Sequence, residues 1–216
     1  MINNKKHIIF DWNGTLVDDT WIFVDILNVL LKSRNIQPIT IEQYRNQFCF
    51  PIKQFYEKIG ISHDSESFLR LEKDFIKEYK ARMYLPGLFS DTITTLKLLL
   101  KREVEVSILS ASNQTILENL LTHYQIKKFF HYICGVDNYS ANGKLENGVD
   151  LLKKINYDKK NILIVGDTDY DYKVAKTLGV DCVLMSSGHQ SEKRLRYISN
   201  NLIKSIAELK NYNLYK

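Results

Sequence analysis

Five short apolar runs, separated by segments with helical apolar spacing, constrain what this chain can fold into. The runs lie at residues 7–10, 104–109, 132–136, 161–165 and 181–185. The helical patterns between them cover residues 89–100, 114–123, 148–155 and 170–178. Strands and helices that alternate at this spacing form a parallel sheet with helices on both faces. The pattern therefore predicts an α/β protein whose strand ends meet along one edge of the sheet.

The stretch from about residue 17 to residue 84 departs from this alternation. It has helical patterning throughout and no convincing strand, and Pro38 and Pro51 divide it into segments. The Pro86-Gly87 pair marks the return to the sheet, because neither residue continues a helix comfortably. The sequence predicts an all-helical insertion between the first and second strands.

The composition is that of an ordinary globular chain, with 44% apolar and 25% charged residues. No apolar run reaches the roughly 18 residues that suggest a membrane span. The first residues enter a strand-like segment at once and leave no room for a signal peptide. We therefore expect a soluble, cytoplasmic protein with no membrane partner.

Cysteines and net charge exclude two further classes of site. Cys49, Cys134 and Cys182 are far apart and outside any C-x-x-C pattern, so we expect reduced, mostly buried thiols and neither a disulfide framework nor a thiolate metal site. The net charge of +5 is spread along the chain in lysine pairs. Nucleic-acid binders usually concentrate such charge on one face, so we expect no nucleic-acid partner.

Asp11 ends the first apolar run and is followed by Asn13 and Gly14. Ligands of open parallel sheets bind at the carboxyl ends of the strands. A glycine there permits a tight turn, and a carboxylate fixed at a strand end can attack phosphorus. The alternative role for Asp11 is a helix cap, which Asp18 or Asp19 suits better.

A second acidic cluster, Asp167, Asp169 and Asp171, follows the run at 161–165. Two carboxylates four residues apart, beside a third from another strand, suit Mg²⁺, which prefers a few hard oxygen ligands. The dipole of the following helix would also favour acidic residues, so one of the three could be structural. Clustered like charges repel unless a cation compensates them, which favours a metal site.

Two weaker signals lie between these clusters. Ser110 follows the run at 104–109 at the start of a helical pattern, where a hydroxyl beside free backbone N–H groups suits phosphate, although a single serine there is more often an N-cap. Lys144 stands in a polar loop, Asn142 to Glu146, whose flexibility could bring an ammonium to the phosphate. A lysine in such a loop is usually solvated.

Together these residues resemble the haloacid dehalogenase superfamily of phosphatases, and in particular its phosphoglycolate phosphatase-like group, over almost the whole chain. The family pattern is D-x-D-G-T, a Ser or Thr after the second strand, a basic residue, and G-D-x-x-x-D. It stands here, in the same order, as residues 11–15, Ser110, Lys144 and residues 166–171. The resemblance implies a three-layer, Rossmann-like parallel sheet core at 1–16 and 85–216 and an inserted helical cap domain at 17–84.

The resemblance also implies a role for each matching position. Asp11 would be the nucleophile, and Lys144 would offset the charge around it. The Mg²⁺ ligands would be Asp11, the backbone carbonyl of Asn13, Asp167 and Asp171, the last directly or through water. The substrate-binding residues would be Ser110, the N–H of Ala111 and Thr15. The cap would supply specificity, and it offers Tyr44, Arg45, Lys53, Tyr56 and Arg82.

Asn13 is the main departure from the family pattern, which has an Asp there. In the phosphatases this Asp protonates the leaving alcohol and then activates water, whereas an amide has no proton to exchange near neutral pH. The change predicts slow turnover, because such help contributes a factor of about 10² to 10⁴. His189 is one candidate substitute, although a histidine in that position is more often a surface loop residue or lies at the cap boundary; Asp18 and Asp19 are others.

Three functions follow from the sequence. The leading one is a phosphatase that hydrolyses a small phosphorylated metabolite through an aspartyl-phosphate, with phosphoglycolate as an analogy from the cap type. The second is a metal-independent dehalogenase of the same fold, against which Asp167 and Asp171 argue. The third is a catalytically weakened binding or regulatory protein, which Asn13 supports.

Overall fold

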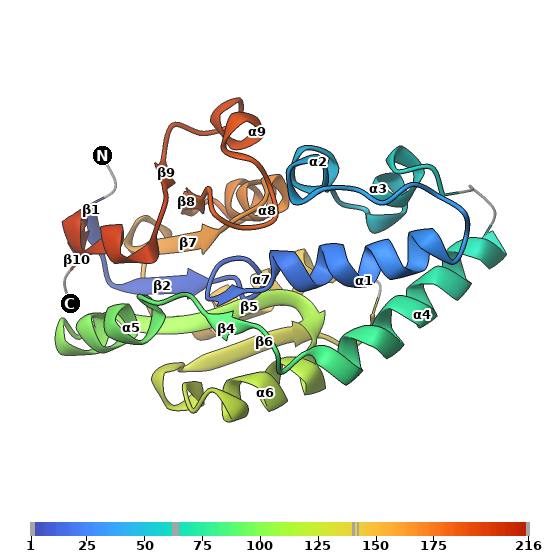
Figure 1. Ribbon diagram of the computed structural model, residues 1–216. Coiled ribbons are helices and arrows are strands. Elements are labelled where there is room, and N and C mark those ends of the chain that lie inside the picture. The colour runs from blue at the N-terminus through green and yellow to red at the C-terminus, as the bar shows by residue number, and fades with distance from the viewer. Residues whose placement is uncertain (1–2, 62–64, 140, 142, 215–216) are drawn as a thin grey trace.

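The computed structural model describes residues 3–61, 65–139, 141 and 143–214. Its centre is a six-stranded sheet in the order β6-β5-β2-β7-β8-β9, and every neighbouring pair is parallel (Figure 1). The strands are β2 (His7–Phe10), β5 (Glu105–Asn113), β6 (Tyr132–Val136), β7 (Ile162–Gly166), β8 (Asp181–Met185) and β9 (Leu202–Ile203). The predicted parallel sheet is confirmed.

The central strand β2 sends its side chains to two separate cores. All four of its residues are buried, as expected of a parallel strand covered on both faces. Ile8 belongs to one hydrophobic cluster and Ile9 to the other, because successive side chains of a strand point to opposite faces. The apolar run that ends in Asp11 is therefore the middle of a three-layer structure.

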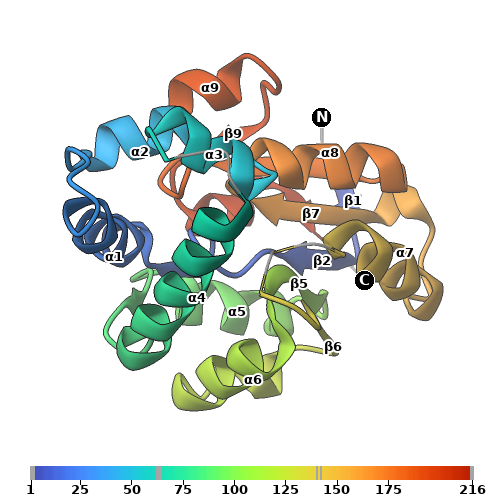
Figure 2. The ribbon, with the colours of Figure 1, turned by 90° about the vertical axis from the view of Figure 1, so that its right-hand side faces the viewer.

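Helices cover both faces of this sheet (Figure 2). The helices α5 (Thr92–Lys101) and α6 (Gln114–His123) pack on the face of Ile8. On the face of Ile9 lie α7 (Lys144–Lys154) and α8 (Asp169–Leu178). The smaller elements are β1 (Asn3–Lys5), β10 (Asn213–Leu214), α9 (Glu192–Arg196) and the 3₁₀ turns η1 (Lys127–Phe129), η2 (Lys159–Asn161) and η3 (Ile206–Asn211).

The predicted insertion contains α1 (Thr20–Lys32), α2 (Ile41–Gln47), α3 (Ile52–Lys58) and α4 (Ser65–Arg82). In Figure 1 these helices extend from one end of the sheet, and α1 packs along α4. Their apolar faces continue the cluster that contains Ile8, so the insertion and the sheet share one core. Thr40 begins α2 with a capping box to Gln43, which satisfies the first free N–H groups of that helix.

A short antiparallel ribbon lies where the chain leaves and re-enters the sheet. Val17–Asp18 forms β3 and pairs with Gly87–Leu88, which forms β4. The expectation of no strand after residue 16 was wrong at these two residues. Two residues are too few to show an alternating pattern, and their pairing depends on a partner far along the chain.

Among the described residues, none of the helices combines the length and apolar character that a membrane span requires. The three cysteines are free thiols, with Cys49 and Cys182 buried and Cys134 half-buried.

Candidate active site

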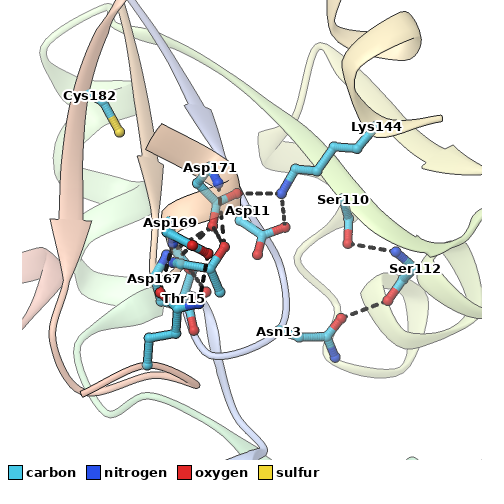
Figure 3. A network of polar contacts seen from close by, with 12 residues as sticks. Asp11, Asn13, Thr15, Ser110, Ser112, Lys144, Asp167, Asp169, Asp171 and Cys182 are labelled. Atoms are coloured by element: carbon cyan, nitrogen blue, oxygen red, sulfur yellow. Dashed lines mark hydrogen bonds and ion pairs between the residues drawn. The ribbon is translucent and has the colours of Figure 1, made fainter. Parts of the chain in front are cut away.

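Three aspartates meet at the carboxyl ends of β2 and β7 (Figure 3). Asp11 follows β2, Asp167 follows β7, and Asp171 lies in the first turn of α8. Phe10 pairs with Val165 across the two strands, so the residues that follow them are neighbours. All three carboxylates are buried, and one oxygen from each lies within 4.8 Å of the others.

Asp171 also organises the start of α8. It forms a capping box with Thr168, whose backbone N–H lies 3.0 Å and whose hydroxyl lies 2.6 Å from Asp171 Oδ2. The backbone N–H of Asp167 donates to the same oxygen at 3.2 Å. The sequence left open that one of the aspartates only stabilises the start of the following helix, and Asp171 has this role in α8. Its other oxygen, Oδ1, still faces the cluster.

Lys144 supplies the positive charge in this cluster. Its Nζ lies 2.8 Å from Asp11 Oδ1 and 2.5 Å from Asp171 Oδ1, and its side chain is buried. The interpretation of Lys144 as a flexible-loop residue was wrong, because it is the first residue of α7 and two carboxylates hold its ammonium. Asn142, which belongs to the same sequence segment, lies outside the described residues.

Burial and mutual repulsion shift the pKa values of these groups. Burial raises the pKa of Asp11 to about 6, against the opposing effect of Lys144, and burial with the charges of Asp11 and Asp171 raises the pKa of Asp167 to about 8. Burial also acts to raise the pKa of Asp171, but Lys144 and the Thr168 hydrogen bonds outweigh it and lower that pKa. Burial would lower the pKa of Lys144, but the two carboxylates raise it.

One ammonium does not balance three buried carboxylates. Oxygen ligands that converge within a few ångströms are the donor set that Mg²⁺ prefers. A divalent cation there would offset both the burial and the repulsion by Asp11 and Asp171 that raise the pKa of Asp167. The residues present therefore fit the metal that the sequence predicted.

Backbone closely surrounds the Asp167 carboxylate. Gly14 has φ +69°, and a Cβ at Gly14 or Gly188 would lie 2.3 or 2.2 Å from Asp167 Oδ2, so both positions need glycine. The N–H of His189 donates to this oxygen at 2.5 Å. Thr15 donates its hydroxyl to Asp167 Oδ1 at 3.3 Å, so it contacts the acidic cluster directly, and its role in substrate binding stays a prediction.

Ser110 lies inside β5, three residues before the Asn113 side chain caps α6. The expectation that Ser110 stands at the helix N-terminus was therefore wrong. The polar run after Leu109 lacks the apolar pattern of a strand, yet Asn113 still pairs with Val136 after an irregularity in the ladder. The Ser110 hydroxyl accepts from the N–H of Ser112 at 3.1 Å.

Asn13 is held on both sides of its amide. Its Oδ1 accepts from the hydroxyl of Ser112 at 2.6 Å, and its Nδ2 donates to Asp19 Oδ2 at 2.5 Å. The other Asp19 oxygen accepts from the N–H of Gly14 at 2.9 Å. Asp19 occupies the N-cap position of α1 but makes no side-chain capping bond, so the sequence-based capping role was wrong for its carboxylate. Asp18 is exposed.

His189 is buried, and its interpretation as a surface loop residue was wrong. Its Nε2 lies 3.1 Å from Asp19 Oδ1, and its Nδ1 lies 2.8 Å from the hydroxyl of Tyr44. Burial would lower the pKa of His189, but the Asp19 carboxylate outweighs it and raises that pKa. The Asp19–His189–Tyr44 chain joins three distant parts of the sequence, and only the position of His189 after β8 pointed towards it.

A cavity of about 150 Å³ opens above the carboxylates. The core contributes Asp11, Asn13, Ser110, Ala111, Lys144 and Asp167 to its lining. The insertion contributes the opposite wall, including Tyr44 and Tyr56. The residues predicted for catalysis, metal binding and substrate binding are thus gathered at one site; Thr15 and Asp171 do not line the cavity, but both contact the acidic cluster.

The family model of haloacid dehalogenase-like hydrolases matches residues 8–185, which contain all of these groups except His189. The chain belongs to this family. It is 25% identical over 203 residues to a phosphoglycolate phosphatase of Pseudomonas fluorescens (strain Pf0-1), with coverage of 91% of this chain and 75% of that protein. It is 21% identical to the phosphoglycolate phosphatase of Rhodobacter capsulatus, with 85% of each chain covered.

Solved structures agree with the fold. The haloacid dehalogenase-like family protein SP0104 from Streptococcus pneumoniae superposes with a TM-score of 0.81 at 19% identity, covering 96% of this chain and 98% of that one. The Rossmann-like fold of the family, expected from the sequence, is confirmed.

Proposed function

We propose that this chain is a Mg²⁺-dependent phosphatase that hydrolyses a small phosphorylated metabolite through an aspartyl-phosphate on Asp11. The observation that carries the proposal is the contact of Asp11 with Lys144 on the floor of a cavity, beside the carboxylates of Asp167 and Asp171. The phosphoglycolate phosphatases among its relatives support phosphate esters as the substrate class.

Asp11, Asp167, Asp171 and the backbone carbonyl of Asn13 are the proposed Mg²⁺ ligands. Bound there, the metal would neutralise charge so that a phosphate dianion can approach the carboxylates. Ser110, the N–H of Ala111 and Lys144 would hold the phosphate oxygens.

In the first step, an oxygen of Asp11 attacks phosphorus and the bond to the ester oxygen breaks, so that phosphate stays on Asp11 and the departing alkoxide takes its proton from water. In the second, water attacks phosphorus, the bond to Asp11 breaks, and inorganic phosphate leaves. Asn13 has no proton to exchange in either step, so turnover on poor leaving groups should be slower by a factor of about 10² to 10⁴ than with an acid there.

We propose residues 17–84 as a cap domain over a core of residues 1–16 and 85–216. The wall that this segment contributes to the cavity, including Tyr44 from α2 and Phe75 from α4, supports the proposal. Such a wall would exclude water while phosphate is transferred to Asp11. A cytoplasmic location stays a prediction from the sequence.

Hydrolysis of p-nitrophenyl phosphate tests the proposal, because its good leaving group needs little help from an acid. We expect phosphate release with Mg²⁺, loss of activity with a chelator, and recovery when Mg²⁺ returns. Asp11→Asn should abolish the activity, whereas Asp150→Asn, at an exposed site on α7, should retain it. No release from a broad panel of phosphate esters would refute a phosphatase.

The same preparation separates the two other functions that the sequence allowed. A dehalogenase would release halide from 2-chloropropionate with a chelator present. A weakened binding protein would hydrolyse no ester but would still bind inorganic phosphate in the presence of Mg²⁺.

A further inference from the structure

The cavity wall opposite the acidic cluster is apolar and aromatic. It includes Phe23 and Leu27 from α1, Phe48 after α2, Phe55 from α3, and Phe75 and Ile76 from α4. These side chains come from three of the four helices of the insertion and from the residue that follows α2, so the apolar character belongs to the whole wall. The organic part of a substrate whose phosphate lies at Asp11 would extend towards this wall.

Glu72 on α4 is the charged residue that the described part of the insertion adds to the lining. Burial raises the pKa of Tyr56, another lining residue, and the negative charge of Glu72 adds to this shift. The charge of Glu72 is therefore felt by groups inside the cavity. The core adds Lys144, whose ammonium already contacts Asp11 and Asp171. A second anionic group on a substrate would therefore face an apolar wall and a carboxylate.

The three basic side chains expected to provide cap specificity lie elsewhere, two of them in contact with other groups. Arg45 donates to the backbone carbonyl of Ser187 at 2.7 Å, and Arg82 pairs with Asp25. Lys53 is exposed. Within the described part of the insertion, no lysine or arginine lines the cavity.

His189 also lines the cavity, but both of its ring nitrogens are occupied, Nε2 by Asp19 and Nδ1 by the Tyr44 hydroxyl. The described part of the wall therefore offers no unpaired cation to a carboxylate such as that of phosphoglycolate, which requires one when it leaves water.

We propose that the substrate is a phosphate monoester whose organic part is apolar or aromatic and carries no anionic group. This inference rests on the proposed function, since it places the phosphate at Asp11. The apolar body gains from leaving water against Phe23, Phe55 and Phe75, while Glu72 repels a second anion. The proposed substrate class therefore differs from phosphoglycolate, the substrate that the relatives are named for, because phosphoglycolate carries a carboxylate besides its phosphate.

Benzyl phosphate and 4-carboxybenzyl phosphate test the proposal, because they share the bond that breaks and differ by one carboxylate. With Mg²⁺ present, we expect kcat/KM for benzyl phosphate to be about tenfold or more above that for its carboxylated partner. Phosphoglycolate should also be a poorer substrate than benzyl phosphate. Equal or faster hydrolysis of the carboxylated ester would overturn the inference and leave the phosphatase proposal standing.

Glu72→Gln tests the charge of the wall with little change in shape. It should narrow the difference between the two benzyl esters by severalfold through faster use of the carboxylated one. Glu78→Gln, on the same helix but outside the cavity lining, should leave the ratio unchanged. If the ratio of kcat/KM between the two benzyl esters is unchanged in Glu72→Gln, Glu72 does not repel the second anion and the proposed repulsion is contradicted.

Binding of two non-hydrolysable ligands separates this inference from the proposed function. Benzylphosphonate should bind the Mg²⁺-loaded protein about tenfold or more tightly than 4-carboxybenzylphosphonate, as measured by calorimetry. If this preference is found but no ester is hydrolysed, the proposed function fails while the ligand class stands. If neither phosphonate binds, or the carboxylated one binds better, the inference is overturned.

Discussion

The side-chain amide of Asn13 donates a hydrogen bond to the carboxylate of Asp19, with 2.5 Å between Nδ2 and Oδ2. Asp19 also accepts from the N–H of Gly14 and lies 3.1 Å from His189 Nε2. Position 13, where the family pattern has an acid, thus holds an amide, and this amide contacts the buried carboxylate of Asp19. An aspartate at position 13 would face Asp19, so the two positions must be considered together.

Exchanging the two residues should restore an acid without setting two carboxylates against each other. In Asn13→Asp/Asp19→Asn, the new amide at 19 can accept from Gly14 and donate to the new carboxylate. We expect hydrolysis of an alkyl phosphate to rise by up to about 10²-fold, with smaller gains on p-nitrophenyl phosphate. Steady-state kinetics on both esters measures this change.

The single variants are the controls for this exchange. Asn13→Asp alone removes the donor to Asp19 and should lower the free energy of unfolding by about 1–3 kcal/mol, while Asp19→Asn alone should bring no gain in rate. An exchange variant no faster than the parent on the alkyl ester would show that the acid at position 13 does not limit turnover.

Lys144 should stabilise the metal-free protein strongly. Lys144→Met leaves Asp11 and Asp171 buried without their cation, so we expect the free energy of unfolding to fall by about 3–5 kcal/mol. Phosphatase activity should fall as well, because an ammonium near the phosphate is lost. Urea unfolding with and without Mg²⁺ measures the first effect, and Mg²⁺ should reduce the deficit.

Lys153→Met is the matched control, since Lys153 lies on the same helix in an exposed pair with Asp150. It should change stability and activity little. A similar stability in the two variants would contradict the charge balance inferred for Lys144.

Asp167 should make metal binding depend on pH. Its pKa rises from the ordinary 3.8 to about 8 in the folded, metal-free protein, so it holds a proton at pH 7. A raised carboxyl pKa gives stability at low pH that is lost as pH rises towards 8. Mg²⁺ needs the carboxylate, so its binding at pH 7 should release about one proton. Calorimetry in buffers of different ionisation enthalpy counts this proton.

Asp167→Asn should abolish the stabilisation by Mg²⁺ and make the metal-free protein more stable than the parent near pH 8, where the parent must bury the charge. Asp158→Asn, at an exposed carboxyl, should change neither quantity. Mg²⁺ binding by the parent without proton release would show that Asp167 is already ionised at pH 7.

Much of the sheet could be predicted because its strands are buried on both faces. β2, β6 and β8 begin and end where the apolar runs at 7–10, 132–136 and 181–185 do. Asp11 and Asp167 could be brought together from sequence, since each follows a buried strand and the carboxyl ends of parallel strands meet at one edge.

The contacts of Asp19, His189 and Tyr44 could not be predicted in the same way. Locally, Asp19 stands at the N-cap position of α1, His189 lies in the loop after β8, and Tyr44 lies in α2. Their hydrogen bonds depend on how these three segments pack against one another. The residues that line the cavity could not be predicted from the sequence for the same reason. Spacing along one helix shows that Phe23 or Phe75 is apolar, but only packing decides that it lines a cavity.

The contribution of His7 to stability should decrease in mild acid. His7 is buried in β2, with Nε2 2.9 Å from Ser107 Oγ, and burial lowers its pKa from 6.5 to about 4 although Glu105 opposes this. Below pH 6.5 the unfolded chain takes up a proton at His7 that the folded protein does not bind, so the contribution of His7 to stability falls until pH 4, by at most about 1.4 kcal/mol per pH unit. His7→Gln removes this titration and leaves the opposite contribution of Asp167 unchanged, so the free energy of unfolding of the variant relative to the parent should rise as pH falls from 7 to 4, as measured by urea unfolding. His123→Gln, at an exposed histidine, should keep the parent's slope, and a parental slope in His7→Gln would place the acid sensitivity elsewhere.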